Sequence, residues 1–246
     1  MFSGQTGGPL LTKYGTEQVG ISAEIAIGDL TGVPIAPEYR NRGRVELATH
    51  ITPTLGPLLS RIPKPVRHIA EDQNPVDFLL QGGSTLSVKT NMREAGKIAP
   101  QNIGQPTSLT FWSRLPELIP EGVEISGLNY QQSARLFKQV AQSKTTDLLT
   151  AYWRNLFDCD FLIYVSNVLG QDNELSSSPT ALLYKKAQSP DWDESLLTFT
   201  KSLADWNESS TVKYANHSIG EFQIHNNRNC FKFRFNIKGL MEAGLL

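Results

Sequence analysis

Apolar residues near the start of the chain recur at the spacing of a helix. Between about residues 10 and 30, one face collects Tyr14, Ile21 and Ile25. A spacing of three to four residues is the period of an amphipathic α-helix. Glu24 lies within the same stretch. A second helical stretch is expected around residues 45 to 51, ending where Pro53 and Pro57 follow, because proline removes a backbone donor.

After residue 65 the pattern changes to short strands. Residues 76 to 80 and residues 85 to 89 each form a β-prone run, and the turn Gly82-Gly83-Ser84 separates them. Glycine supplies the backbone angles that a tight turn needs, so these runs predict a β-hairpin. A nearly continuous apolar run at residues 161 to 165 predicts a strand that is buried on both faces.

Helical and strand-like segments alternate through the rest of the chain. Helices are expected to start near residue 107 and to cover most of 128–157 and 195–206. Strands are expected at 221–225 and 230–237, joined by a turn-prone run of Asn and Arg. This mixture predicts an α/β (α+β) fold, with a central mixed β-sheet flanked by helices.

Length and composition narrow the class of protein. With 246 residues, of which 39% are hydrophobic, the chain can form one large globular domain over residues 1–246. The start shows no secretion signal, and no run of about eighteen apolar residues occurs, so a cytoplasmic protein without membrane contact is expected. Cys159 and Cys230 are expected to be reduced core residues. The net charge of −1 means that any nucleic-acid surface must be local.

The first hairpin carries the strongest candidate chemistry. Asp77 lies on its first strand, and Ser87 and Lys89 lie on the second. Side chains alternate along a strand, so Ser87 and Lys89 project from one face, toward Asp77. Phosphodiester hydrolysis needs a carboxylate that holds a divalent metal and a cation or proton donor beside the attacking water. A solvated hairpin with no such role also explains an isolated Asp and Lys.

The wider segment resembles a known nuclease superfamily. The hairpin, about residues 74–91, is similar to the PD-(D/E)XK layout, in which a Pro and an Asp precede an acid-any-Lys strand. Residues 67–78, 86–91 and 97–107 together resemble the catalytic region of type II restriction endonucleases with a Ser-Val-Lys motif. The resemblance covers roughly residues 65–110 and departs from the common pattern at Ser87, which stands in the acid position.

The resemblance implies a magnesium-dependent, sequence-specific endonuclease that cuts both strands of double-stranded DNA. Asp77 would bind Mg²⁺ with the Val88 carbonyl, while Lys89 would position or deprotonate the attacking water and Ser87 would assist by hydrogen bonding. Some members of the superfamily bring a glutamate to the metal from an N-terminal helix, which makes Glu24 the candidate for the missing acid. The resemblance also implies a homodimer, a companion DNA methyltransferase in the same restriction system, and a bacterial or archaeal host.

Candidate DNA contacts lie mainly in the C-terminal hairpin, about residues 220–237. Its apolar face is a run of Phe and Ile, and its other face and turn carry groups that can contact phosphates and bases. These are Gln223, His225, Arg228, Lys232 and Arg234. Further candidates are Gln101 and Gln105 after the catalytic strand, and a basic cluster with Arg40, Arg42, Arg44, Lys64, Arg67 and His68. Ordinary solvated surfaces account for each of these sets equally well.

Two other functions are compatible with the same residues. Ser87 in place of an acid favours a non-catalytic DNA-binding module that keeps the nuclease fold, and a nuclease of repair or recombination is a further alternative. The chain has no phosphate loop ending in Gly-Lys-Ser/Thr, no GxSxG elbow and no spaced zinc ligands. A nucleotide-driven motor and a serine hydrolase are therefore not expected.

Overall fold

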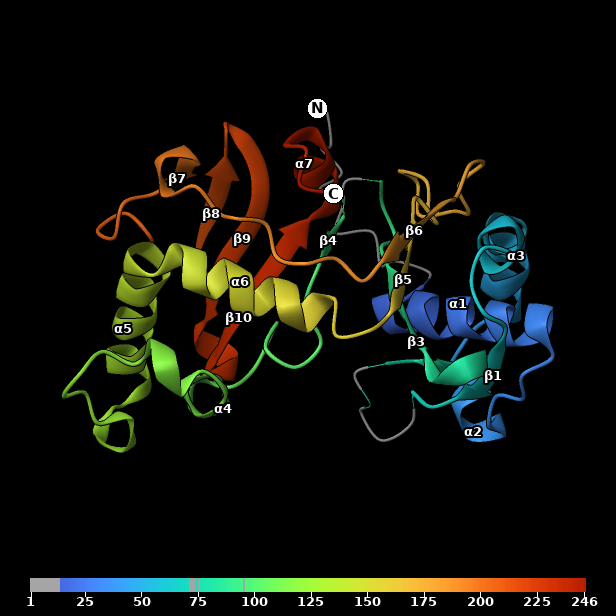
Figure 1. The fold of residues 1–246 in the computed structure, drawn as a ribbon, viewed down its shortest axis with the longest axis horizontal. Coiled ribbons are helices and arrows are strands. Elements are labelled where there is room, and N and C mark those ends of the chain that lie inside the picture. The colour runs from blue at the N-terminus through green and yellow to red at the C-terminus, as the bar shows by residue number, and fades with distance from the viewer. Residues whose placement is uncertain (1–13, 71–73, 75, 95) are drawn as a thin grey trace, which may run out of the picture.

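The computed structural model describes residues 14–70, 74, 76–94 and 96–246. The first residues of the helix expected at 10–30 lie outside the described residues, as do Glu71, Asp72, Gln73 and Pro75 of the motif region. The described elements form two lobes, which lie side by side in Figure 1.

The first lobe contains a mixed sheet and three helices. Its strands run in the order β1 (Pro65–His68), β2 (Phe78–Leu80), β3 (Thr85–Thr90), β5 (Phe161–Ser166) and β6 (Thr180–Lys185). Strands β3 and β5 are parallel, and the other neighbours are antiparallel. The helices are α1 (Thr16–Thr31), α2 (Pro37–Arg40) and α3 (Val45–Leu59). In Figure 1, α1 and α3 lie together on one side of this sheet.

The second lobe contains an antiparallel sheet. Its order is β4 (Lys97–Ile98), β10 (Cys230–Asn236), β9 (His217–His225), β8 (Ser209–Tyr214) and β7 (Leu197–Phe199). Helices α4 (Ser108–Arg114), α5 (Tyr130–Ser143) and α6 (Thr145–Leu156) belong to this lobe, and α7 (Ile237–Glu242) follows β10. Short 3₁₀ turns lie at Gln81–Gly83, Pro116–Leu118, Ile125–Gly127, Glu194–Leu196 and Asn226–Arg228.

Each lobe has its own apolar core. In the mixed sheet, Leu86 and Val88 of β3 pack with α1 and α3, whereas Leu162 and Tyr164 of β5 belong to the core of the other lobe. The mixed sheet is therefore covered on both faces. The second core is strongly aromatic: Phe137 stacks on Phe231 with ring centroids 4.3 Å apart. Such pairs add about 0.5–1.5 kcal/mol beyond the burial of their area.

Most of the expected elements are confirmed, including the mixed sheet flanked by helices. The first predicted hairpin forms with Gly82 and Gly83 at φ values of 82° and 88°, which explains the glycines in the turn. The β5 strand is buried as predicted, and Thr107 caps α4 by accepting from the backbone N–H of Thr110 at 3.2 Å. Both cysteines are buried and free.

Two expectations about secondary structure are wrong. The helix around residue 45 does not stop at Pro53 but continues through both prolines to Leu59. It persists because its buried leucines and isoleucine pack with α1 in one core. The stretch at 195–206 is not a helix: after one 3₁₀ turn it forms the edge strand β7, in which Leu197 and Phe199 contact the aromatic core. The separate antiparallel sheet was not expected either.

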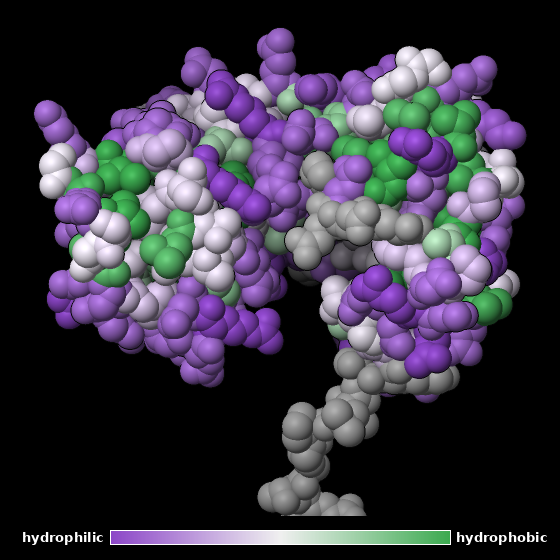
Figure 2. Space-filling view, turned by 90° about the horizontal axis from the view of Figure 1, so that it is seen from below, coloured by the Kyte–Doolittle hydropathy of each residue, from purple (hydrophilic) through white to green (hydrophobic). Residues whose placement is uncertain are grey.

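A hollow lies between the two lobes. Figure 2 shows it from below, with many hydrophilic side chains on the lobes beside it. The expectation of one domain over residues 1–246 stays a prediction. In the part of the chain that the structure describes, no helix is both long and apolar enough to cross a bilayer.

Gly220 of β9 provides a test of the aromatic packing. A Cβ atom at this position would come within 2.6 Å of the buried Phe233 ring. We expect Gly220→Ala to destabilise the protein by about 1–3 kcal/mol through overpacking. Gly56→Ala, in the interior of α3 where a Cβ meets nothing within 4 Å, is the control and is expected to stabilise by up to about 1 kcal/mol. Equal unfolding midpoints in urea for Gly220→Ala and the wild type would contradict this packing.

Candidate active site

The register of the first hairpin places Asp77 beside Ser87. Phe78 pairs with Leu86, and the backbone N–H of Asp77 donates to the Leu86 carbonyl at 3.0 Å. Leu86 and Val88 point into the core beneath α1 and α3. Because side chains alternate, Ser87 and Lys89 leave β3 on the opposite face, the one turned toward the second lobe.

Asp77 is a buried carboxylate with one oxygen fixed by its neighbours. Asp77 as a whole residue is only 6% exposed. Oδ2 accepts hydrogen bonds from the Ser87 hydroxyl at 3.2 Å and from the Val88 N–H at 2.5 Å. None of the described residues donates a hydrogen bond to Oδ1. The carboxylate is thus oriented, with one oxygen left for another ligand.

The environment of Asp77 opposes its ionisation. Burial, followed by the negative charge of Glu24, raises the pKa of Asp77 to about 6. The positive charge of Lys89 and the hydrogen bonds from Val88 and Ser87 act in the opposite direction. The site therefore holds two carboxylates that repel one another, an arrangement that a cation would relieve.

Lys89 lies beside this carboxylate and contacts a residue from the second lobe. Burial lowers the pKa of Lys89, against the opposing effect of the Asp77, Cys159 and Glu24 charges. Its Nζ donates to the side-chain oxygen of Gln101, which follows β4 in the chain. Gln101, expected to contact DNA, thus holds the lysine in this structure. A lysine with a lowered pKa can release or accept a proton near neutral pH more readily than an ordinary one.

Glu24 is buried in α1 and is fixed by two side chains that the sequence did not indicate as its partners. The Tyr39 hydroxyl and Nε2 of His68 each lie 2.8 Å from its Oε2. The His68 side chain is 2% exposed and packs edge-on between the rings of Tyr39 and Phe78. Burial and then the Glu24 charge raise the pKa of Tyr39, which keeps its hydroxyl protonated as a donor.

The structure therefore corrects the interpretation of His68 as part of a basic surface. It brings Glu24 and Asp77 within electrostatic range, as the resemblance implied. Sequence reasoning missed Tyr39 altogether and named His68 only as a member of the basic cluster, not as a partner of Glu24. They lie 15 and 44 positions from Glu24, and no spacing or motif connects them to it.

Two other residues of the expected basic cluster, Arg40 and Arg42, are paired with acids. Arg40 makes two hydrogen bonds to Asp29, at 2.9 and 2.8 Å, and Arg42 contacts Glu17. Their charges are therefore largely neutralised before any phosphate arrives. Gln105 is exposed and makes only a long contact of 4.0 Å to the sulfur of Cys230.

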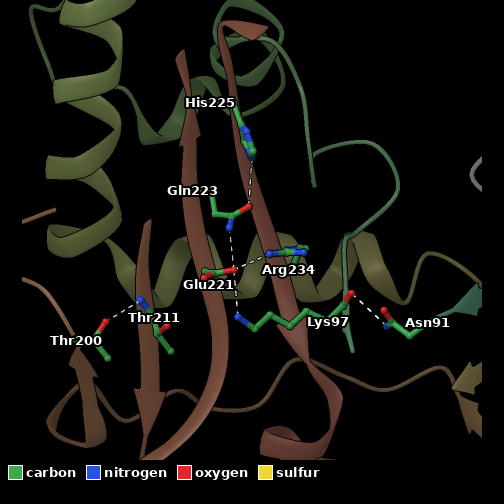
Figure 3. Close-up of polar contacts among 8 residues, drawn as sticks. All are labelled: Asn91, Lys97, Thr200, Thr211, Glu221, Gln223, His225 and Arg234. Atoms are coloured by element: carbon green, nitrogen blue, oxygen red, sulfur yellow. Dashed lines mark hydrogen bonds and ion pairs between the residues drawn. The ribbon is translucent and has the colours of Figure 1, made fainter. Parts of the chain in front are cut away.

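The C-terminal hairpin presents its polar side chains on one face, as its alternation predicted. Figure 3 shows Lys97, Glu221, Gln223, His225 and Arg234 on the face of the antiparallel sheet that is turned away from α6. Oε2 of Glu221 forms ion pairs with Nζ of Lys97 at 3.1 Å and with Nη2 of Arg234 at 2.7 Å. Burial acts to raise the pKa of Glu221, but these two partners hold it below its usual value.

Positive charge gathers near the end of this hairpin. Burial lowers the pKa of Lys232, and the nearby Arg234 and Arg228 lower it further. Like charges this close indicate a surface suited to an anion such as a phosphate. Asn91, directly after β3, donates to the Lys97 carbonyl at 3.2 Å, so this polar face connects to the end of the catalytic strand.

Comparison with known proteins adds a second kind of evidence. The chain resembles a type II restriction enzyme. It is 31% identical over 239 residues to the type II restriction enzyme CviAII of Paramecium bursaria Chlorella virus 1. The match covers 96% of this chain but 61% of CviAII, so the chain spans about three-fifths of the length of that relative. No family model matches the chain, and no solved structure matches it significantly.

The raised pKa of Asp77 predicts a pH-dependent effect on stability. The folded protein keeps the Asp77 proton up to about pH 6, whereas the unfolded chain releases it near the ordinary aspartate pKa of 3.8. Stability contributed by the protonated form is therefore complete below that lower value and is lost as the pH rises through about 6. Asp77→Asn, which cannot ionise, is expected to be more stable than the wild type above pH 6, on the order of 2–3 kcal/mol.

Urea unfolding of the wild type and Asp77→Asn at pH 5 and pH 7.5 measures this difference. The advantage of the variant should grow with pH. A wild type that is the more stable protein at both pH values would show that Asp77 is not a destabilised carboxylate.

Proposed function

We propose that this chain is a magnesium-dependent endonuclease that cuts double-stranded DNA at specific sequences, as a type II restriction enzyme does. The observation that carries the proposal is the buried, oriented Asp77 beside Lys89, at the predicted catalytic hairpin. The similarity to CviAII supports the same function. The similarity covers only part of that enzyme, and we extend its named activity to this chain as a hypothesis.

The donor set fits a magnesium ion. Asp77 and Glu24 are two buried carboxylates, and carboxylate oxygens are hard ligands of the kind that Mg²⁺ prefers. Asp77 and Glu24 would hold the ion, with the carbonyl of Val88, which leaves β3 on the same side as the N–H that donates to Asp77. When bound, the ion would polarise the scissile phosphate and lower the pKa of a coordinated water.

The protein residues divide the remaining work. Ser87 and the Val88 N–H orient Asp77, and Tyr39 with His68 orient Glu24. Lys89 would position the attacking water and help to remove its proton, because burial already weakens its hold on a proton. Ser87 does not replace the acid of the common motif as a ligand; in this proposal Glu24 supplies that charge from α1.

DNA would bind across the hollow between the lobes (Figure 2), with the polar face of β9 and β10 as the second contact. Arg228 and Lys232 would meet phosphates, whereas Arg234, although expected to contact DNA, is paired with Glu221. Arg40 and Arg42 would have to exchange their acidic partners for phosphates, so we expect them to contribute less. Phosphate contacts of this kind give salt-dependent affinity, and contacts to base edges give specificity.

A digestion experiment tests the proposal. Purified protein is incubated with unmethylated phage DNA and Mg²⁺, with EDTA in a parallel sample. Discrete fragments that form only with Mg²⁺ are the expected result. A smear would indicate a nonspecific nuclease, such as one of repair or recombination, and intact DNA would contradict the proposal.

One observation favours a second candidate, a DNA-binding module that keeps the nuclease fold without cutting. Among the described residues, no group of three or more His, Cys, Asp or Glu side chains could hold a metal ion. Such a module would leave phage DNA intact and retard it in a gel. The two outcomes separate the candidates directly.

Several implications of the resemblance remain proposals. A homodimer would supply two active sites for two strands, and a companion methyltransferase would protect the host genome. A cytoplasmic location in a bacterial or archaeal cell belongs to the same set. Sedimentation of the purified protein with and without duplex DNA tests the dimer.

Substitution of Asp77 or of Lys89 should greatly slow cleavage. We expect Asp77→Asn and Lys89→Met to reduce the cleavage rate by roughly 10²–10⁴-fold, because each removes a group placed at the reacting phosphate. Binding of uncleaved duplex should persist in both variants. Initial rates on a supercoiled plasmid measure the effect. Unchanged rates in both variants would place the active site elsewhere.

The contacts to Glu24 predict a difference between two substitutions of His68. Glutamine can place its side-chain N–H near the position of Nε2, whereas the shorter asparagine cannot. We expect His68→Asn to weaken Mg²⁺ binding by roughly 10- to 100-fold and His68→Gln to retain most of it. Calorimetric titration of the DNA-free protein with Mg²⁺ measures both affinities. Equal affinities in both variants and the wild type would remove His68 from the site.

A further inference from the structure

A row of polar side chains that contact one another across the antiparallel sheet fixes the orientation of the Gln223 amide. Figure 3 shows it running from Lys97 and Arg234 through Glu221 and Gln223 to His225. Glu221 can only accept, so the amide nitrogen of Gln223 must be the atom 3.0 Å from its Oε2. The amide oxygen of Gln223 then faces His225, with Nε2 of the imidazole 3.3 Å away.

The orientation of Gln223 determines what His225 can offer to a ligand. An amide oxygen only accepts, so Nε2 of His225 carries a hydrogen. Burial and the neighbouring charges of Lys232, Arg228 and Arg234 lower the pKa of His225, against the opposing charge of Glu208, which favours the neutral ring at physiological pH. In a neutral ring with hydrogen on Nε2, Nδ1 is an acceptor. No described residue hydrogen-bonds to this Nδ1.

His225 lines a pocket at the end of the hairpin. The pocket has a volume of about 310 Å³ and is formed by Glu208, Ser209, Gln223, His225, Asn226 and Asn227, together with Ile224. Glu208 precedes β8, and its carbonyl accepts from the Ile224 N–H at 2.7 Å, which fixes this residue against β9. The pocket thus brings together an acceptor-only carboxylate, an imidazole acceptor and several amides.

These groups point to a ligand that donates hydrogen bonds rather than to a phosphate. The Glu208 carboxylate repels phosphate oxygens, although the surface around it carries Arg228, Lys232 and Arg234. In a DNA duplex, the donors that project into the major groove are the exocyclic amino groups of adenine and cytosine. The turn of the β9–β10 hairpin, at Asn226–Arg228, borders this pocket, and it is this end of the hairpin that would enter the major groove.

We propose that this pocket reads a base of the recognition sequence, with Glu208 and Nδ1 of His225 accepting from the exocyclic amino group of an adenine or cytosine. Gln223 acts as a positioning residue, because it holds His225 through a row that begins at Lys97 and Arg234. Arg228 and Lys232 contact the flanking phosphates and carry no sequence information. The inference rests on the proposed binding of duplex DNA, but not on its cleavage.

A binding selection tests this inference. Duplexes with randomised sequence are selected by the Asp77→Asn protein, so that bound DNA is not consumed, and affinities are then measured for the selected site and its single-base variants. The selected base at each position shows whether adenine or cytosine is read. The same selection is repeated with Glu208→Gln and with Gln223→Met added. Lys232→Gln provides a phosphate-contact comparison, and Glu46→Gln, an exposed carboxylate on α3, is the matched control.

Glu208→Gln and Gln223→Met should both reduce discrimination at the same single base position, by roughly 10- to 100-fold, and leave the other positions unchanged. Lys232→Gln should weaken binding to all duplexes about equally. The slope of log affinity against log salt concentration should fall by about one, the value for one lost phosphate contact. Glu46→Gln should select the same sequence as the parent.

Two results would overturn the inference. One is an unchanged selected sequence in both pocket variants; the other is a uniform change of affinity for all sequences. A parent protein that selects no sequence at all would also refute it. Selection without any cleavage by the wild type would refute the endonuclease proposal alone.

Discussion

Burial of the Asp77 carboxylate beside a second acid is the constraint on which the account of this site depends. A buried charge is costly unless partners compensate it, and here Ser87, the Val88 N–H and Lys89 compensate only in part, since the pKa remains raised to about 6. Stability alone does not explain such an arrangement. Residues that oppose folding in this way are expected where function requires them, and the cation-dependent reaction that we propose at this position would supply that reason.

The two-lobed architecture places the rest of the proposed machinery around this carboxylate. The mixed sheet provides Asp77 and Lys89, and α1 brings Glu24 toward the same edge. The segment after β3 then passes into the antiparallel sheet, where Gln101 contacts Lys89 and Lys97 begins the polar row toward His225. We thus assign chemistry and DNA contact to different lobes, between which the chain passes after β3, after α6 and after β6. In this proposal, the residues that contact DNA can vary in the C-terminal hairpin without disturbing the strand that carries Lys89.

Local signals in the sequence predicted the hairpin and the proximity of Asp77 to Ser87, but not the contacts that hold Glu24. Two glycines, β-prone runs and side-chain alternation suffice to place Asp77 beside Ser87, because these effects act over a few residues. Tyr39 and His68 reach Glu24 only through the packing of α1 against the mixed sheet, which no local pattern encodes. Packing also explains the failures at Pro53 and at β7, where burial of apolar side chains outweighs local propensity.

The ionisation of Asp77 itself tests the central claim most directly. Selective ¹³C labelling of the aspartate carboxyl groups, with Asp77→Asn to assign the signal, gives its titration curve by NMR with and without Mg²⁺. The account predicts a midpoint near pH 6 without the ion and a clearly lower midpoint with it. A midpoint near the ordinary aspartate value of 3.8 that Mg²⁺ does not move would contradict the account.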